Sequence, residues 1–284
     1  MLAAVFFGGG GTLPGLAATL AAMCLIAFAL DRHPAYPLVL IANRDELHAR
    51  AAAPAGQDPQ YPDVHGGRDL EQGGSWLMVS RRGRLAAVTN VRVRPLDATH
   101  PRSRGALVRG FATGTMGVDA WLDALAPAAG DYGPFNLVLW DGRSLAFAGN
   151  HPRFARHRVA PGLHAMSNGA FDAPWPKSNR ASQALATWLQ DGAPPDAQAA
   201  DVAPLLAALA DQTPAPDTAL PDTGVGLELE RKLSPPFVRD ARYGTRCSTV
   251  VLVQADGIRF VERRFGPDAA PLGESDTWLP RTAG

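Results

Sequence analysis

Short, uninterrupted apolar runs alternate with turn-forming residues along this 284-residue chain. The runs at 24–30 and 37–43 are separated by a loop rich in turn formers, and such runs are typical of strands that are buried on both faces. Further strands are expected on either side of turns at 81–83 and 141–142, and in a closing hairpin around 255–257. The pattern therefore predicts sheets built from short strands that are adjacent in sequence.

Four segments show helical spacing of apolar residues and fall into two pairs. They are 103–114, 118–128, 178–190 and 201–211. The resulting order of strands, helices, strands, helices and strands lacks the alternation of a doubly wound parallel fold. We predict an α+β fold with antiparallel sheets and either segregated helices or helical layers around the sheets. Segments 51–73 and 266–284 are rich in Pro and Gly and are expected to be irregular.

Length and composition favour one globular domain, because 46% hydrophobic residues can supply a sizeable core. Basic and acidic residues number 27 each, so no overall field attracts nucleic acid or an anionic membrane. A small or uncharged partner is therefore expected.

Residues 1–22 form an uncharged, low-complexity stretch in front of Met23 and Cys24. The stretch has no basic residue, contains a glycine run and Pro14, and does not end in a lipoprotein-type Leu-x-x-Cys, which argues against a leader or anchor. We expect an upstream extension of the reading frame with synthesis starting at Met23, and a cytoplasmic protein without stable membrane insertion. An exported leader and an ordered tail are the alternatives.

The two cysteines, Cys24 and Cys247, lack CxxC spacing, which argues against a zinc ribbon or a disulfide scaffold. One bridge between them remains an alternative. The seven histidines form no HxxxH or HExxH pair, and no Walker or G-x-G-x-x-G pattern is present. We therefore predict no metal site and no phosphate-binding loop.

Cys24 acquires a specific chemistry if it is the first residue of the mature chain. Its α-amine, which titrates near neutral pH, can then take the proton of its own thiol. Asparagine amides can stabilise the oxyanion, Asp45 can orient the amine, and Arg246 can hold the thiolate or a substrate acyl group. The alternative is a buried structural cysteine, the usual state of a free thiol.

Several polar residues stand where strands are predicted to end, a common place for functional side chains. Each also has a structural interpretation, because asparagine often forms turns and an exposed arginine often makes only a weak surface pair. The candidates are Asn43, Arg44, Asp45, Glu46, Thr89, Asn90, Ser167, Asn168 and Arg246. The segment "PWPKSN" contains Trp175 and Lys177 and leads into a helix, so Trp175 is interpreted as a packing residue.

Taken together, the motifs resemble the NRDE family, which is named for the motif that stands here at Asn43–Glu46 and which includes the transport and Golgi organisation protein two relatives of animals. The resemblance covers about residues 23–265, within one domain at 23–284 whose core spans about 24–265. It rests on "MC", "ANRDE", "GGSWLMVS", "GRLAAVTN", "SRG", "FNL", "SN", "PWPK" and "YGTRCSTVV", in the family's order.

The NRDE family in turn is similar to N-terminal nucleophile hydrolases of the choloylglycine hydrolase branch. This similarity implies an αββα sandwich of two antiparallel sheets between helical layers. It assigns catalytic roles to Cys24, Asp45, Asn168 and Arg246, and contacts with substrate to Asn43, Arg44 and Asn90. That branch has an Arg-Asn-x-Asp segment, whose match here is Ala42-Asn43-Arg44-Asp45, so its arginine is replaced by Ala42.

Two functions follow from the resemblance. The first is an N-terminal-cysteine amidohydrolase that cleaves a nonpeptide C–N bond of a small-molecule amide without a cofactor. The alternative is a noncatalytic carrier that binds haem or a lipid-like ligand in the same cleft.

Overall fold

The first two apolar runs form β1 (Met23–His33) and β2 (Tyr36–Leu47), which are neighbours in a six-stranded sheet. The computed structural model describes residues 23–94 and 99–282, so the predicted extension at 1–22 lies outside the described residues. The strand order of this sheet is β10-β1-β2-β11-β12-β13. Its other members are β10 (Gly162–Met166), β11 (Tyr243–Val253), β12 (Gly257–Phe265) and β13 (Pro271–Pro280).

A second sheet has seven strands in the order β3-β4-β5-β6-β7-β8-β9, and neighbouring strands in both sheets run antiparallel. Its strands are β3 (Ala52–Gln57), β4 (Val64–Asp69), β5 (Leu77–Ser80), β6 (Arg84–Asn90), β7 (Phe135–Trp140), β8 (Leu145–Gly149) and β9 (Ala155–Arg158). The helices are α1 (Gly105–Thr113), α2 (Val118–Leu125), α3 (Pro176–Gln190), α4 (Ala203–Leu209) and α5 (Leu227–Lys232).

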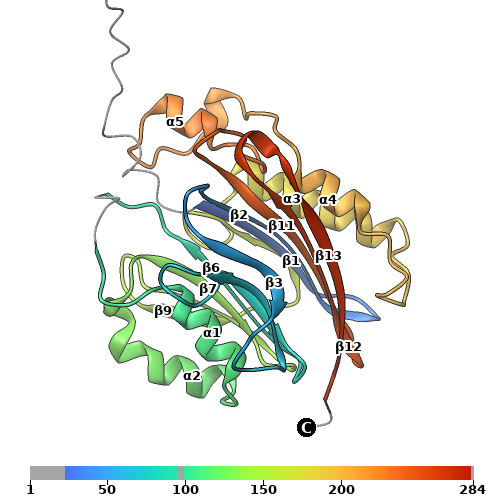
Figure 1. The fold of residues 1–284 in the computed structure, drawn as a ribbon. Coiled ribbons are helices and arrows are strands. Elements are labelled where there is room, and N and C mark those ends of the chain that lie inside the picture. The colour runs from blue at the N-terminus through green and yellow to red at the C-terminus, as the bar shows by residue number, and fades with distance from the viewer. Residues whose placement is uncertain (1–22, 95–98, 283–284) are drawn as a thin grey trace, which may run out of the picture.

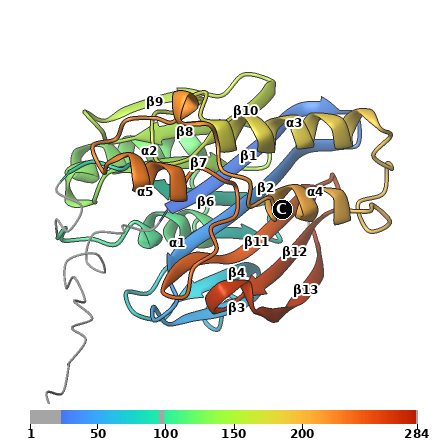
Figure 2. The same cartoon turned by 90° about the horizontal axis from the view of Figure 1, so that it is seen from above.

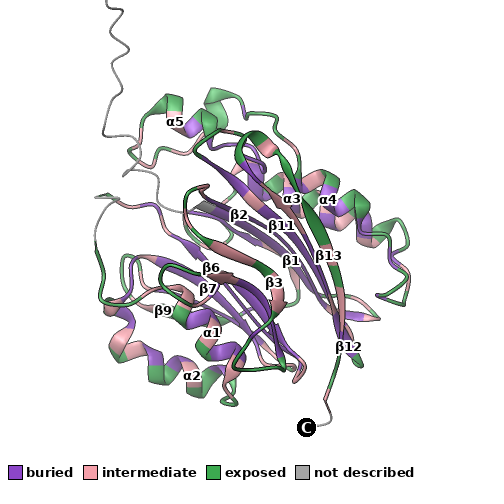
Figure 3. Cartoon of the chain, in the orientation of Figure 1, coloured by how far each residue is buried: buried purple, intermediate pink, exposed green. Residues whose placement is uncertain are grey.

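The two sheets face each other, and helices cover both outer faces (Figures 1 and 2). One apolar core fills the space between the sheets, a second lies beneath α3 and α4, and a third lies beneath α1 and α2. Buried residues accordingly follow both sheets, whereas the outer faces of the helices are exposed (Figure 3). The predicted αββα sandwich and the two predicted pairs of helices are confirmed.

The position of β1 explains why its sequence shows no polar alternation. Ile26 and Phe28 point into the core between the sheets, whereas Leu25 and Ala27 point into the core beneath α3 and α4. Because successive side chains of a strand lie on opposite faces, a strand segment packed between two apolar cores is apolar at successive positions, as 24–30 is.

Two predictions of irregular structure were wrong. Segment 51–73 contains β3 and β4, and the terminal segment contains β13. Both β3 and β13 are edge strands with largely exposed or half-buried side chains, so they lack an apolar signal. In β4, Gly67 makes room for Trp76, because a Cβ at Gly67 would lie 2.0 Å from the Trp76 ring.

Among the described residues, no helix combines the length and the apolarity that crossing a bilayer requires.

Candidate active site

The Asn-Arg-Asp-Glu motif forms the end of β2, inside the six-stranded sheet rather than in a surface turn. All four side chains are buried, with exposed fractions between 0% and 7%. Continuing the alternation of β2, Arg44 and Glu46 lie on the face between the sheets, and Asn43 and Asp45 lie on the face covered by helices. The motif therefore supplies charges to both faces of one sheet.

Asn43 connects the sheet to the segments that cover it. Its Nδ2 donates to the carbonyl oxygens of Leu209 and Pro236 at 2.8 and 2.9 Å, and its Oδ1 accepts from Ser248 Oγ at 2.6 Å. Both amide protons are thus engaged within the protein. The predicted contact between Asn43 and a substrate stays a prediction.

Cys24 lies directly opposite Arg44, at the start of β1. Its side chain is 7% exposed, and its thiol is free. Burial, and secondly the Asp45 carboxylate, raise the pKa of the Cys24 thiol to about 12, while Arg44 opposes the shift. A thiol of this pKa is protonated at neutral pH, so it needs an adjacent base before it can act as a nucleophile.

Asp45 is fully buried and lies opposite Met23 on one side and Thr245 on the other. Its Oδ1 accepts a hydrogen bond from Thr245 Oγ1 at 2.6 Å, but its Oδ2 has no hydrogen-bond partner among the described residues. Burial raises the pKa of this carboxyl to about 6, although the Lys177 ammonium and the Thr245 hydroxyl both lower it. One acceptor atom beside the start of β1 is therefore left unsatisfied.

Ser167 and Asn168 adjoin Cys24 from the other side. Ser167 Oγ lies 2.8 Å from the carbonyl oxygen of Cys24 and 3.1 Å from Asn168 Oδ1. Asn168 Nδ2 in turn donates to the carbonyl oxygen of Asn90 at 3.0 Å. The structure thus brings together Cys24, Asn168 and Asn90, which come from three separate segments.

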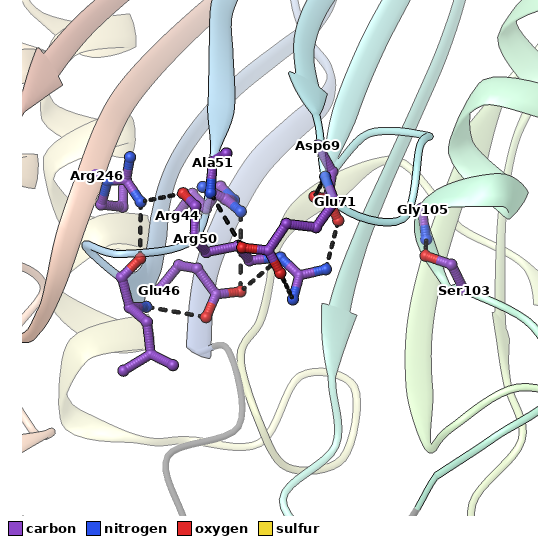
Figure 4. Close-up of polar contacts among 10 residues, drawn as sticks. Arg44, Glu46, Arg50, Ala51, Asp69, Glu71, Ser103, Gly105 and Arg246 are labelled. Carbon is purple, nitrogen blue, oxygen red and sulfur yellow. Dashed lines mark hydrogen bonds and ion pairs between the residues drawn. The ribbon is translucent and has the colours of Figure 1, made fainter. Parts of the chain in front are cut away.

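Arg246 lies at a β-bulge between Thr245 and Cys247, where the register of β11 against β2 shifts. Its Nη1 donates to the carbonyl oxygens of Leu47 and Arg50 at 2.7 and 3.0 Å (Figure 4). The charges with the largest effect on the pKa of the Cys24 thiol are those of Asp45, Arg44 and Glu46. Arg246 thus holds the chain that follows β2, and its predicted catalytic role stays a prediction.

Ion pairs surround the end of β2 on the face between the sheets. Arg50 Nη2 lies 2.6 Å from Asp69 Oδ2, and Arg50 Nε lies 3.7 Å from Glu46 Oε2 (Figure 4). Arg44 Nη2 lies 3.8 Å from the same Glu46 oxygen, and the Arg44 guanidinium stacks 4.2 Å from the centre of the Trp76 ring. These contacts fix Arg44 beside Cys24.

A cleft of about 210 Å³ opens beside Arg44. Strand register places Cys24, Arg44, Cys247 and Arg264 in one row across four neighbouring strands, so this cleft and the Cys24 thiol share one face of the sheet. The cleft is lined by Arg44, Ala52, Ala53, Pro54, Trp76, Arg246, Cys247, Glu262, Arg264, Phe265 and Leu272. It combines three guanidinium groups with an apolar wall.

Glu262 is the one acidic residue that lines this cleft. Its Oε1 accepts from the backbone N–H of Ala55 at 2.8 Å, and its Oε2 has no hydrogen-bond partner in the part of the chain that the structure describes. Burial raises the pKa of the Glu262 carboxyl. The charge of the cleft is accordingly dominated by its arginines.

Comparison with known proteins decides the family. The sequence profile of the family Transport and Golgi organisation 2 matches residues 23–267. The chain belongs to this family. The resemblance to the NRDE proteins is thereby confirmed.

Animal members of the Transport and Golgi organisation 2 family match along most of their length. A homologue from Bos taurus is 36% identical over 261 residues, covering 85% of this chain and 92% of the relative. A homologue from Homo sapiens is 34% identical over 262 residues, with the same coverage of both chains.

Two solved structures of hydrolases cover 90% of this chain. A mutant of the conjugated bile acid hydrolase from Clostridium perfringens has 9% identity and a TM-score of 0.43, and the match covers 92% of it. The penicillin V acylase from Agrobacterium tumefaciens has 11% identity and a TM-score of 0.40, with 85% of its chain covered.

Two basic residues of this Transport and Golgi organisation 2 domain were not among the predicted site residues. Arg104 is half-buried at the start of α1, where burial lowers its pKa while Cys24 and Glu46 raise it. Lys177, at the start of α3, is 2% exposed and interacts electrostatically with Asp45 and Cys24. Arg104 belongs to the motif "SRG" and Lys177 to the motif "PWPK". These two motifs are the sequence features that could have indicated both residues as members of the site.

Ala42 is buried in the core between the sheets. Arg44, Arg104 and Lys177 are the positively charged residues that interact electrostatically with Cys24 in the described part of the chain. No group of three or more potential metal ligands occurs within residues 23–94 and 99–282.

Proposed function

We propose that this protein is an N-terminal-cysteine amidohydrolase that cleaves a nonpeptide C–N bond through a thioester on Cys24. The observation that carries the proposal is Asp45 Oδ2, which is buried beside the start of β1 and has no hydrogen-bond partner within the described part of the chain. Once Met23 is removed, the α-amine of Cys24 provides the donor that this carboxylate lacks. The same amine provides the base that a thiol with a pKa of about 12 requires.

In the proposed reaction, the Cys24 thiol gives its proton to the α-amine as the sulfur bonds to the carbonyl carbon of the amide. The Asn168 amide, which has a second N–H besides the one bound to Asn90, stabilises the oxyanion. The C–N bond then breaks, and the α-ammonium protonates the leaving amine. Water attacks the thioester, loses a proton to the α-amine, and releases the acid as the C–S bond breaks and the thiolate recovers that proton.

The test uses hexanoyl p-nitroanilide as the amide and the matching p-nitrophenyl ester as an acylating probe. Wild-type protein is expected to release p-nitroaniline and to gain one hexanoyl group on Cys24, detected by intact mass and peptide mapping. Cys24→Ala should lose both signals because the variant lacks the attacking thiol. Cys247→Ala is the matched control, since Cys247 lies in the same row of the sheet but two strands away. Labelling that persists in Cys24→Ala contradicts the proposal.

A noncatalytic carrier is the second candidate, and the arginine-lined cleft beside Arg44 favours it. Three guanidinium groups beside an apolar wall suit the carboxylate edge of an amphipathic ligand such as haem or a fatty acid.

For the carrier, haemin titrated into wild-type protein should shift its absorption band. Arg264→Gln should weaken binding about tenfold, as expected for loss of a charged hydrogen bond, and Arg242→Gln, an exposed arginine outside the cleft, should not. A spectrum that excess protein leaves unchanged excludes haem as the cargo.

Under either function the free thiols suit a reducing compartment, and we propose that the protein is cytoplasmic.

A further inference from the structure

Lys177 is a charged residue that is buried inside the fold. Its side chain is 2% exposed, and its Nζ has no hydrogen-bond partner among the described residues. Asp45 Oδ2 is likewise buried and has no hydrogen-bond partner among the described residues. A buried ammonium or carboxylate without partners is costly, so two such groups acting on each other call for an explanation.

The position of Lys177 is fixed by the start of α3. Pro176 begins the helix, and Trp175 immediately precedes it. The Trp175 ring packs on Gly169, where a Cβ would lie 2.5 Å from the ring. Because Gly169 directly follows Asn168, the segment that carries Asn168 also holds the helix start that carries Lys177.

Charged and titratable groups face Lys177 from four segments. They are Cys24 on β1, Asp45 on β2, Arg92 after β6 and Glu230 on α5. Arg92 Nη1 and Glu230 Oε2 lie 2.7 Å apart and largely neutralise each other. Asp45 is therefore the one carboxylate in this group that is left to compensate the ammonium.

The pKa shifts of the two groups are consistent with this pairing. Burial lowers the pKa of Lys177 to about 8 and raises that of Asp45 to about 6. In each case the other member of the pair is the strongest charge that opposes burial. Near pH 7 both groups are therefore mostly charged.

We propose that Lys177 is a positioning residue of the Cys24 site, whose ammonium compensates the Asp45 carboxylate and so keeps the base beside the thiol unprotonated. This inference rests on the proposed function. Asp45 alone would favour the protonated α-amine, because a nearby carboxylate stabilises an ammonium. The Lys177 ammonium disfavours that proton electrostatically, whether the proton is on the α-amine or on the Asp45 carboxylate.

The choice of lysine fits this role. The chain has only two lysines, Lys177 and Lys232, and its other basic residues are arginines and histidines. An ammonium on a flexible stem can lose its proton when buried, whereas a guanidinium stays charged. The Lys177 ammonium therefore titrates near pH 8, where its coupling to Asp45 can be measured.

The first test measures the coupling in the full chain and does not depend on turnover. Labelling with lysine enriched in 13C at Cε gives two NMR signals, one from Lys177 and one from the exposed Lys232. The Lys177 signal should titrate near pH 8 and shift again near pH 6 as Asp45 titrates.

Asp45→Asn should lower the Lys177 midpoint by about one pH unit or more. Asp240→Asn, which removes the partner of Lys232 at 2.6 Å, is the matched control and should leave Lys177 unchanged. A Lys177 midpoint near 10.5, or one that responds neither to Asp45→Asn nor to pH near 6, overturns the inference. The wild-type titration remains decisive even where Asp45→Asn does not fold.

The second test connects Lys177 to Cys24. In protein whose first residue is Cys24, the rate of acylation by p-nitrophenyl hexanoate is measured against pH. In Lys177→Met, the pH below which the acylation rate falls should rise by about one unit. Lys177→Arg should return this pH to its wild-type value, and Lys232→Met should leave it unchanged. If wild-type protein forms no Cys24 adduct, the proposed function fails while the NMR coupling still stands. If the adduct forms and Lys177→Met leaves the profile unmoved, the inference fails alone.

Discussion

A single residue retained in front of Cys24 is expected to lower the rate of acyl-enzyme formation by about 10²–10⁴-fold, the range typical for loss of a general base. In that form the α-amine is part of a peptide bond and cannot accept a proton. The thiol then keeps a pKa of about 12, so its thiolate is scarce at neutral pH. Asp45 Oδ2 also remains without its donor.

The measurement compares protein that begins at Cys24 with protein that carries one alanine before it. Intact mass establishes each N-terminus, and stopped-flow release of p-nitrophenol from p-nitrophenyl hexanoate gives the acylation rate. Thermal unfolding of both proteins shows whether the fold is preserved. Equal rates in the two proteins would mean that the α-amine is not the base.

The central strands could be predicted because burial on both faces leaves a strong sequence signal. For this reason β1 is apolar over 24–30 and β2 over 36–42, and the helices α1 to α4 show one apolar face each. Edge strands lack that signal. β3 and β13 each have only one neighbouring strand and expose much of their length, so composition alone suggested irregular structure.

The candidate site was predictable in part. Cys24, Asn90 and Asn168 were proposed from separate motifs, and the structure brings them together through Ser167 and backbone hydrogen bonds. The contacts of Arg246 could not be predicted, because they depend on a bulge in β11 that the residue types do not reveal. Lys177 was missed because its burial comes from the packing of α3 against β1.

The buried charges of this site also predict a conflict between stability and chemistry. Replacing both members of the pair, with Asp45→Asn and Lys177→Met in one protein, is expected to raise the free energy of unfolding by about 1–4 kcal/mol at pH 7. Within residues 23–94 and 99–282, neither Asp45 Oδ2 nor Lys177 Nζ has a hydrogen bond that offsets its loss of hydration. The double variant removes both charges at once.

The pH dependence of this gain follows from the two pKa shifts. Because the pKa of Asp45 is raised from 3.8 to about 6, the stability of the wild-type protein falls as the pH rises through about 6. Because the pKa of Lys177 is lowered from 10.5 to about 8, that stability recovers between about pH 8 and 10.5. The advantage of the double variant should thus be largest between pH 6 and 8 and smaller on either side.

Urea unfolding of wild type, both single variants and the double variant measures these free energies as a double-mutant cycle. Each single variant leaves one buried charge without its counter-charge, so both should be less stable than the double variant. A double variant that is less stable than wild type at pH 7 would show that the pair contributes to stability. A more stable but inactive double variant would mean that Asp45 and Lys177 are retained for the chemistry at Cys24 despite their cost to the fold.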